Sequence, residues 1–192
     1  MKSIAISGSP RENVGKRDAK ELRYDGKVPA VLYGGATQTH FSVSAADLKP
    51  VVYTPDVHFI DLEIAGVKSQ AVIQDIQFHP LTEKIIHVDF LALDQNKPIA
   101  IDIPVKLTGT SPGVKMGGKL VQKLRKLKVK GLPKDHVDTV DVSIEGLEVG
   151  KSVRVREINL PNLQIVSAAE DTIVSVTTSR ALRQAEQEAN KK

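Results

Sequence analysis

Apolar and polar residues alternate along much of the chain, and a period of two is the pattern of half-exposed β-strands. In the first half, alternation or short runs of β-forming residues predict strands at residues 4–6, 28–33, 39–43, 57–64, 67–78 and 85–93. Because glycine permits positive φ, Ala65 and Gly66 predict a hairpin turn between two of these strands. The alternation continues in the second half, at residues 99–107, 140–144, 153–156 and 173–177.

Helix-forming residues gather in a few short segments. Residues 15–24 are rich in helix formers and end at an Asp-Gly pair, and Ser44 has the position of an N-cap before a short helix that Pro50 is expected to stop. The last residues, 179–192, are helix-prone as well, but Leu182 is their only large apolar side chain, which predicts a solvated extension. The predicted fold class is mainly β with minor helices, and the first half is a sheet or a barrel.

The aromatic residues divide the chain into two parts. All seven of them precede residue 91, so the second half must build its core from aliphatic side chains. Two cores of different chemistry indicate two domains, and the polar residues 94–98 have the composition of a boundary. We therefore predict a first domain at residues 1–94, a C-terminal β domain at 95–179 and a helical or disordered tail at 180–192.

Charge is distributed unevenly along the 192 residues, although the net charge is only +4. Residues 1–27 hold seven bases against four acids, residues 28–94 hold three against eight, and residues 113–134 hold eight bases and no acid. The chain has no cysteine, which excludes disulfides and thiolate metal sites. Since no apolar run approaches the roughly 18 residues of a membrane helix, we expect a globular, cytoplasmic protein without a membrane partner.

Two glycine–lysine segments imitate a phosphate-binding loop. Residues 113–119 have the required spacing, but Leu120 stands where a magnesium-binding hydroxyl is needed. Residues 146–152 are one residue short of that spacing, and a strand pattern follows them instead of the helix that would hold a phosphate. Turn glycines beside basic strands explain both segments better, and no nucleotide cofactor is predicted.

Histidine spacing offers a second chemical arrangement. His79, Glu83 and His87 are four residues apart and would stack on a helix, but Pro80 and the β-rich residues 85–88 disfavour that helix. On a strand, His87 and Asp89 would instead share one face, and no third catalytic partner is evident. We therefore expect no metal, no cofactor, no small-molecule substrate and no enzyme activity.

Basic residues near the N-terminus suggest a binding surface, formed by Arg11, Lys16, Arg17, Lys20, Arg23 and Lys27. If residues 16–24 are helical, Lys16, Lys20 and Arg23 share one face. Such a stripe suits nucleic-acid phosphates better than a membrane, because no bulky apolar face opposes it. An ordinary solvated helix face, with Asp18 and Glu21 among the bases, explains the same charges equally well.

A longer string of residues shifts the balance toward the binding surface. Its four blocks are Arg11-Glu-Asn-Val-Gly-Lys16, Leu22-Arg23-Tyr-Asp-Gly26-Lys-Val-Pro29-Ala-Val-Leu-Tyr33-Gly34-Gly35, Gln74-Asp75-Ile-Gln77-Phe-His79-Pro80 and His87-Val-Asp89-Phe90. In order and spacing they resemble the bacterial large-subunit ribosomal protein family twenty-five, the 5S-rRNA-binding family that includes the Ctc general stress proteins. The match covers nearly all of residues 1–93. The second half resembles the C-terminal β domain of the family's long form, with residues 117–118 and 140–143 as weaker markers.

The resemblance implies a small N-terminal β-barrel that docks on 5S rRNA in the central protuberance of the large ribosomal subunit. By position, it implies RNA contacts at Arg11, Lys16, Lys20, Arg23, Tyr33, Gln74, His87 and Asp89. The chemistry of these residue types agrees, because arginine and lysine suit phosphates while tyrosine, glutamine, histidine and aspartate can read base edges or 2′-hydroxyls. Phe90, on the opposite face of its strand, is expected in the core.

The basic segment at residues 113–134 allows two interpretations. It is either a second rRNA contact, through Lys119, Lys123, Arg125, Lys126 and Lys128, or a β-hairpin with a solvated lysine-rich edge. Neighbouring ribosomal proteins are further expected partners of the C-terminal domain. The leading functional hypothesis is a structural constituent of the large ribosomal subunit, and the alternative is a stress-linked, ribosome-associated β-protein that binds RNA loosely and without specificity.

Overall fold

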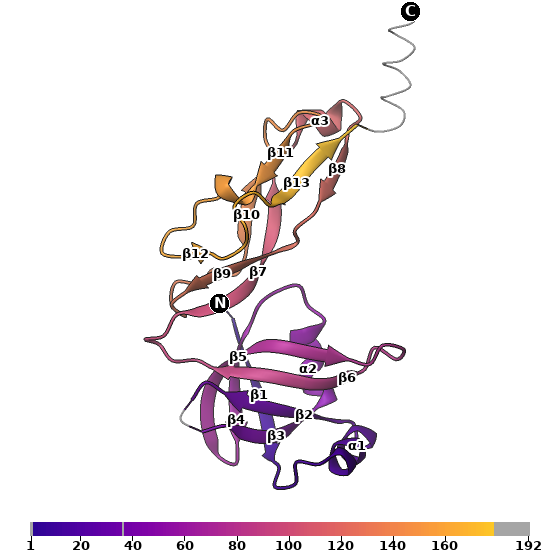
Figure 1. The fold of residues 1–192 in the computed structure, drawn as a ribbon, viewed down its shortest axis with the longest axis vertical. Coiled ribbons are helices and arrows are strands. Elements are labelled where there is room, and N and C mark those ends of the chain that lie inside the picture. The colour runs from indigo at the N-terminus through magenta and orange to yellow at the C-terminus, as the bar shows by residue number, and fades with distance from the viewer. Residues whose placement is uncertain (1, 36, 179–192) are drawn as a thin grey trace, which may run out of the picture. The chain divides into compact units, whose positions relative to one another are not determined.

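The computed structural model describes residues 2–35 and 37–178, which are mainly β-strand with a few short helices (Figure 1). The chain folds into two compact units, one of residues 1–99 with 132–138 and one of residues 100–131 with those from 139 onward. The predicted fold class is confirmed. The domain limits 1–94 and 95–179 stay predictions, and the predicted tail at 180–192 lies outside the described residues.

In the described part of the first unit, six strands close into a barrel in the order β1-β3-β2-β6-β5-β4. Their bounds are β1 (Ser3–Pro10), β2 (Lys27–Tyr33), β3 (Thr39–Ser44), β4 (Phe59–Ile64), β5 (Val67–Phe78) and β6 (Ile85–Ala92). The pairs β1–β4 and β2–β6 are parallel and the other four are antiparallel. Ala65 and Gly66 both have positive φ, so the predicted hairpin between β4 and β5 is confirmed.

Alternate side chains of every barrel strand fill its interior. Phe41 and Phe90 are fully buried with ring centroids 5.5 Å apart, and aliphatic residues such as Ile60, Leu62 and Val88 surround them. A tilted aromatic pair contributes about 0.5–1.5 kcal/mol beyond the area it buries. The expectation that Phe90 belongs to the core is confirmed.

Helix α2 (Ala45–Val52) packs against the barrel by burying Leu48 and Val51. The Ser44 side chain accepts the backbone N–H of Ala46, as its N-cap position predicts. The prediction that Pro50 stops the helix is wrong, because α2 continues for two more residues. A proline removes one helical hydrogen bond, and here the buried side chains on either side of it hold the last turn in place.

Helix α1 (Lys16–Tyr24) matches the predicted helix but has no buried residue among its nine, all of which the structure describes. An arginine forms hydrogen bonds near each end of the helix. Before it, the Arg11 guanidinium donates from Nε (3.1 Å) and Nη2 (2.5 Å) to Oδ2 of Asp18, and also to the carbonyl of Asn13. Near its end, Arg23 Nε donates to the Ile86 carbonyl of β6 at 3.1 Å. Arginine hydrogen bonds, together with the half-buried side chains of Ala19 and Leu22, therefore attach this helix to the barrel.

The second unit contains two small sheets within its described residues. One has the order β10-β7-β9-β12 and the other the order β11-β13-β8. The strands are β7 (Ile99–Thr108), β8 (Lys119–Gln122), β9 (Lys126–Gly131), β10 (Val140–Ser143), β11 (Ser152–Arg154), β12 (Gln164–Ile165) and β13 (Thr172–Thr177), with α3 (Pro112–Lys115) and the 3-10 turn η1 (Val155–Glu157) between them. The predicted strand at 153–156 is shorter, because η1 begins at Val155.

The basic segment at 113–134 does not form the β-hairpin that one interpretation expected. Its strands β8 and β9 belong to different sheets, so they do not pair with each other. In β9, Leu127 and Val129 are fully buried while Lys126, Lys128 and Lys130 are exposed. Alternation along β9 was visible in the sequence, but the choice of sheet depends on pairing with distant strands.

The ion pair before α1 generates a test of how this helix is held. The Arg11 side chain is only 8% exposed, so Arg11→Met leaves the Asp18 carboxylate without its partner and we expect a cost of about 1–2 kcal/mol. Amide hydrogen exchange in α1 should accelerate roughly 5- to 30-fold. The double variant Arg11→Met/Asp18→Asn should cost less than the sum of the single variants.

The matched control is the other arginine–carboxylate pair of this region, Arg17 with Glu21, whose side chains are 94% and 65% exposed. An exposed pair contributes little to stability. Arg17→Met should therefore change the free energy of opening of α1, as measured by amide hydrogen exchange, by no more than a few tenths of a kcal/mol. Equal effects of Arg11→Met and Arg17→Met would show that the buried ion pair does not hold the helix.

Candidate nucleic-acid interface

The outer face of β2, β6 and β5 carries a cluster of polar side chains. Val88 and Phe90 point into the barrel, so His87 and Asp89, which alternate with them, point outward. In the register of the sheet, Asp75 and Gln77 of β5 lie opposite Asp89 and His87. On the other side of β6, residue Asp89 pairs with Val31, two residues before Tyr33. We call the residues Tyr33, Asp75, Gln77, His87 and Asp89 the polar face.

His87 and Asp89 contact each other directly. Nδ1 of His87 lies 2.7 Å from Oδ1 of Asp89, and each side chain is 30% exposed. The prediction that the two share one strand face is confirmed. The contact fixes the direction of the imidazole ring, which leaves its Nε2 edge as the hydrogen-bonding group on the face of the sheet.

Tyr33 supplies a hydroxyl among these acceptors. Burial raises the pKa of its phenol above the ordinary 10.0, and the negative charges of Asp89 and Asp75 raise this pKa further. The phenol therefore keeps its proton and can donate a hydrogen bond. Asp75 and Asp89 lie directly opposite each other, an arrangement of like charges that disfavours folding unless donors satisfy both carboxylates.

Gln74 stands at a break in the ladder between β5 and β6. The register shifts between Ile73 and Asp75, so Gln74 is the extra residue of a bulge and its side chain is exposed. A bulge re-aims side chains and increases local twist, and bulges are over-represented beside functional sites. A second shift makes Ile86 the extra residue of β6, and its carbonyl accepts the hydrogen bond from Arg23.

The last of the basic residues predicted on α1, Arg23, adjoins the polar face. Lys16 and Lys20 are exposed, with Lys20 Nζ 5.8 Å from the ring centroid of Tyr24. Arg23 is bound to Ile86, the residue that precedes His87, so the end of α1 adjoins the polar face. Arg11 is mostly buried against Asp18, which gives it a structural contact beside the predicted RNA contact.

Sequence reasoning missed Asp75 and Gln77 as members of this surface. The signal that could have found them is the alternation Asp-Ile-Gln along β5, which has the same period as His-Val-Asp along β6. The structure brings Tyr33, His87 and Asp89 together as predicted, with Asp75 as an added neighbour. Lys16, Lys20 and Arg23 belong to α1, the end of which adjoins this face.

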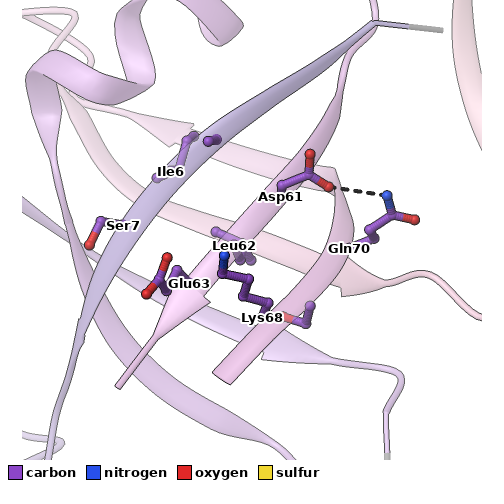
Figure 2. Close-up of a pocket in the computed structure, with 9 residues that line it drawn as sticks. Ile6, Ser7, Asp61, Leu62, Glu63, Lys68 and Gln70 are labelled. Atoms are coloured by element: carbon purple, nitrogen blue, oxygen red, sulfur yellow. Dashed lines mark hydrogen bonds between the residues drawn. The ribbon is translucent and has the colours of Figure 1, made fainter. Parts of the chain in front are cut away.

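Another side of the barrel carries a hollow that we call the acidic hollow. Strands β1, β4 and β5 line it, and Figure 2 shows the carboxylates of Asp61 and Glu63 beside Lys68 and Gln70. Nε2 of Gln70 donates to Asp61 at 3.1 Å. Two carboxylates against one lysine repel phosphate, so this hollow does not suit a nucleic-acid backbone.

The five basic residues predicted as a second contact are all exposed in the second unit. They are Lys119 of β8, Lys123 and Arg125 in the following turn, and Lys126 and Lys128 of β9. The segments that imitate phosphate-binding loops are each followed by a strand, β8 or β11, as their interpretation as turn glycines predicts.

Within the described residues, no group of three or more His, Cys, Asp or Glu side chains is placed to hold a metal ion. His79 and Glu83 lie in the turn after β5, where Nδ1 of His79 accepts the backbone N–H groups of Leu81 and Thr82. Of the helices in the described ranges, none has the length and apolar character needed to cross a membrane.

Comparison with known proteins identifies the family. The model of the Ribosomal L25p family matches residues 6–90, and that of the Ribosomal protein TL5, C-terminal domain, matches residues 98–180. Similar relatives occur in Amoebophilus asiaticus (strain 5a2), 46% identical over 100% of this chain and 98% of the relative, and in Cytophaga hutchinsonii, 45% identical over 100% of both. A relative from Bacteroides thetaiotaomicron is 41% identical, again over 100% of both chains. All three are named large ribosomal subunit protein bL25. With a barrel that matches the first model, a C-terminal β unit that matches the second and full-length similarity to these relatives, the chain belongs to the bL25 family of ribosomal proteins.

Proposed function

We propose that this protein is a structural constituent of the large ribosomal subunit that binds 5S rRNA in the central protuberance. The bL25 family is one of structural proteins without catalytic activity, which agrees with the expectation that the chain is not an enzyme. The observation that carries the RNA proposal is the polar face beside a basic, surface-mounted helix. A role in the bacterial ribosome places the protein in the cytoplasm.

The polar face has the donors and acceptors that RNA recognition requires. The wide, shallow minor groove of an RNA helix displays 2′-hydroxyls and base edges. Tyr33, which keeps its proton, donates to such groups, whereas Asp75 and Asp89 accept from base amines and sugar hydroxyls. The carboxylates exclude phosphate from the centre of the face, so phosphates are expected at its edge, on Lys16, Lys20 and Arg23 of α1.

A second rRNA contact is proposed for the C-terminal unit, through Lys119, Lys123, Arg125, Lys126 and Lys128. Lys126 and Lys128 support it, because they stand on one exposed face of β9 while Leu127 and Val129, which alternate with them, anchor the strand in the core. Neighbouring ribosomal proteins are further proposed partners of this unit.

Selectivity distinguishes the leading proposal from the alternative of a stress-linked protein with loose RNA binding. A mobility-shift assay at physiological salt should show tighter binding to 5S rRNA than to an unrelated structured RNA of equal length. Equal affinities would favour the alternative, because attraction to phosphate does not depend on sequence. The leading proposal also predicts that the native protein from cells sediments with the large subunit in a sucrose gradient.

Single changes on the polar face, or at the bulge residue Gln74 beside it, should reduce selectivity. We expect His87→Ala, Asp89→Ala or Gln74→Ala to weaken 5S rRNA binding by about 1–3 kcal/mol, the scale of a base contact, with little change in its salt dependence. Because Asp89 orients His87, the double variant of these two should cost less than the sum of the singles. Gln70→Ala, on β5 but in the acidic hollow, is the control and should leave affinity unchanged. Unchanged affinity in all three folded variants would exclude this face.

The pKa of Tyr33 gives a test that needs no RNA. In a Tyr24→Phe/Tyr53→Phe background, ultraviolet absorbance should show the remaining phenol titrating above pH 10.0. Because the pKa is raised in the folded state, the associated stability is present below pH 10.0 and is lost as the pH rises through the folded value. Adding Asp89→Asn should lower this pKa, since it removes the largest electrostatic contribution. A Tyr33 that titrates at its ordinary pKa would contradict its placement in the polar face.

A further inference from the structure

A basic cleft of about 920 Å³ lies in the first unit between α1, the start of β2, α2 and the turn that joins β5 to β6. Of the described residues that line it, five are cationic and none is a carboxylate. The cationic residues are Lys20, Arg23, Lys27, Lys49 and Lys84. They come from four separate parts of the chain, and only the folded structure brings them together.

These cations are concentrated in the cleft although most of the first unit contains more acidic than basic residues. Residues 28–94 contain three bases and eight acids, and two of the three bases, Lys49 and Lys84, line this cleft. The third, Lys68, lies in the acidic hollow beside Glu63 (Figure 2). An even distribution of charge would not leave a cleft with five cations and no lining acid, so the cleft is electrostatically complementary to an anion.

Backbone contacts hold the walls of the cleft in place. The Ala45 N–H at the start of α2 donates to the Gly26 carbonyl at 3.0 Å, which joins α2 to the start of β2. On the other wall, the hydroxyl of Tyr53 donates to the Glu83 carbonyl at 3.4 Å and so links the end of α2 to the β5–β6 turn. The cations are therefore presented on a preformed surface, and an anion need not order it.

Two aromatic rings in the same cleft point to a nucleic acid rather than to a simple anion. Tyr24 at the end of α1 is 80% exposed, and Tyr53 at the end of α2 is 60% exposed. Large exposed rings among lysines are the arrangement by which proteins bind unpaired nucleotides, since bases stack on the rings while cations hold the backbone. An acidic peptide offers charge but gives these rings no equivalent flat partner.

We propose that this cleft binds an unpaired strand of the same RNA that the polar face contacts, with Lys27, Lys49 and Lys84 on its phosphates and Tyr53 as a stacking platform. The proposal rests on the proposed function. The cleft is continuous with the polar face through Arg23, which lines the cleft and donates to Ile86, the neighbour of His87. The single strand that leaves the bound RNA helix would therefore enter the cleft past the end of α1.

The charges are tested with the full-length double variant Lys49→Gln/Lys84→Gln. Each single-strand phosphate contact contributes roughly 0.7 to the slope of log affinity against log salt, so the magnitude of the slope for 5S rRNA should fall by about 1.4. Affinity at physiological salt should fall about tenfold, while preference over an unrelated RNA is kept. Lys68→Gln removes the same charge from the acidic hollow and should change neither slope nor affinity.

The stacking platform is tested by fluorescence. The chain contains no tryptophan, so Tyr53→Trp introduces a single reporter into the cleft. Binding of 5S rRNA should quench this fluorescence, whereas inorganic phosphate and polyglutamate at equal charge concentration should not. Quenching by those anions to the same extent would overturn the proposal in favour of a general anion site or an acidic protein partner.

The outcomes separate this proposal from the proposed function. If the wild-type protein prefers 5S rRNA and Lys49→Gln/Lys84→Gln binds it with unchanged slope and affinity, the cleft proposal is wrong and the function stands. If the wild-type protein binds both RNAs equally, the specific function fails. The cleft proposal then fails as well if the double variant leaves the salt slope unchanged on both RNAs, and it is supported if that slope falls.

Discussion

Closure of the first unit into a six-stranded barrel is the constraint from which its binding surfaces follow. Two parallel pairings, β1 with β4 and β2 with β6, complete the ring, and each strand then has one face inside and one outside. With Val88 and Phe90 in the core, His87 and Asp89 have no position but the outer surface. A slip of one residue in β6 would exchange the two sets and bury a carboxylate, so packing of the core also fixes the polar face.

Helix α1 follows a different principle, because none of its nine described residues is buried. Most surface helices are held by an apolar stripe, and such a stripe would cover part of the surface that the basic residues need. Here Arg11, which precedes the helix, binds Asp18 in its first turn, and Arg23 binds the Ile86 carbonyl at the bulge in β6. Polar attachment keeps most of the helix surface exposed to a partner, at the cost of the stability that apolar burial provides.

Sequence reasoning succeeded where the deciding interactions are local. The hairpin turn at residues 65 and 66, the Ser44 cap and the pairing of His87 with Asp89 each depend on neighbours within a few residues. It failed where distant strands decide. The position of Asp75 opposite Asp89 depends on a bulge at Gln74, and the separation of β8 from β9 depends on which sheet each strand joins. Alternation predicts that a strand exists, but it does not identify the strand with which it pairs.

Net charge is the least informative of the sequence quantities for this unit, because its charges are separated in space. The acidic hollow is centred on β1 and β4, which lie opposite β2 and β6 in the order of the barrel. Exposed charges separated by more than about 8 Å are largely screened at physiological ionic strength, and a closed six-stranded barrel is on the order of 10 Å or more across. The carboxylates of the hollow therefore weaken phosphate binding on the far side very little. Residues 28–94 hold eight acids and three bases, yet two of those bases, Lys49 and Lys84, line the basic cleft, so the acidic composition of the segment does not conflict with the proposed RNA contact.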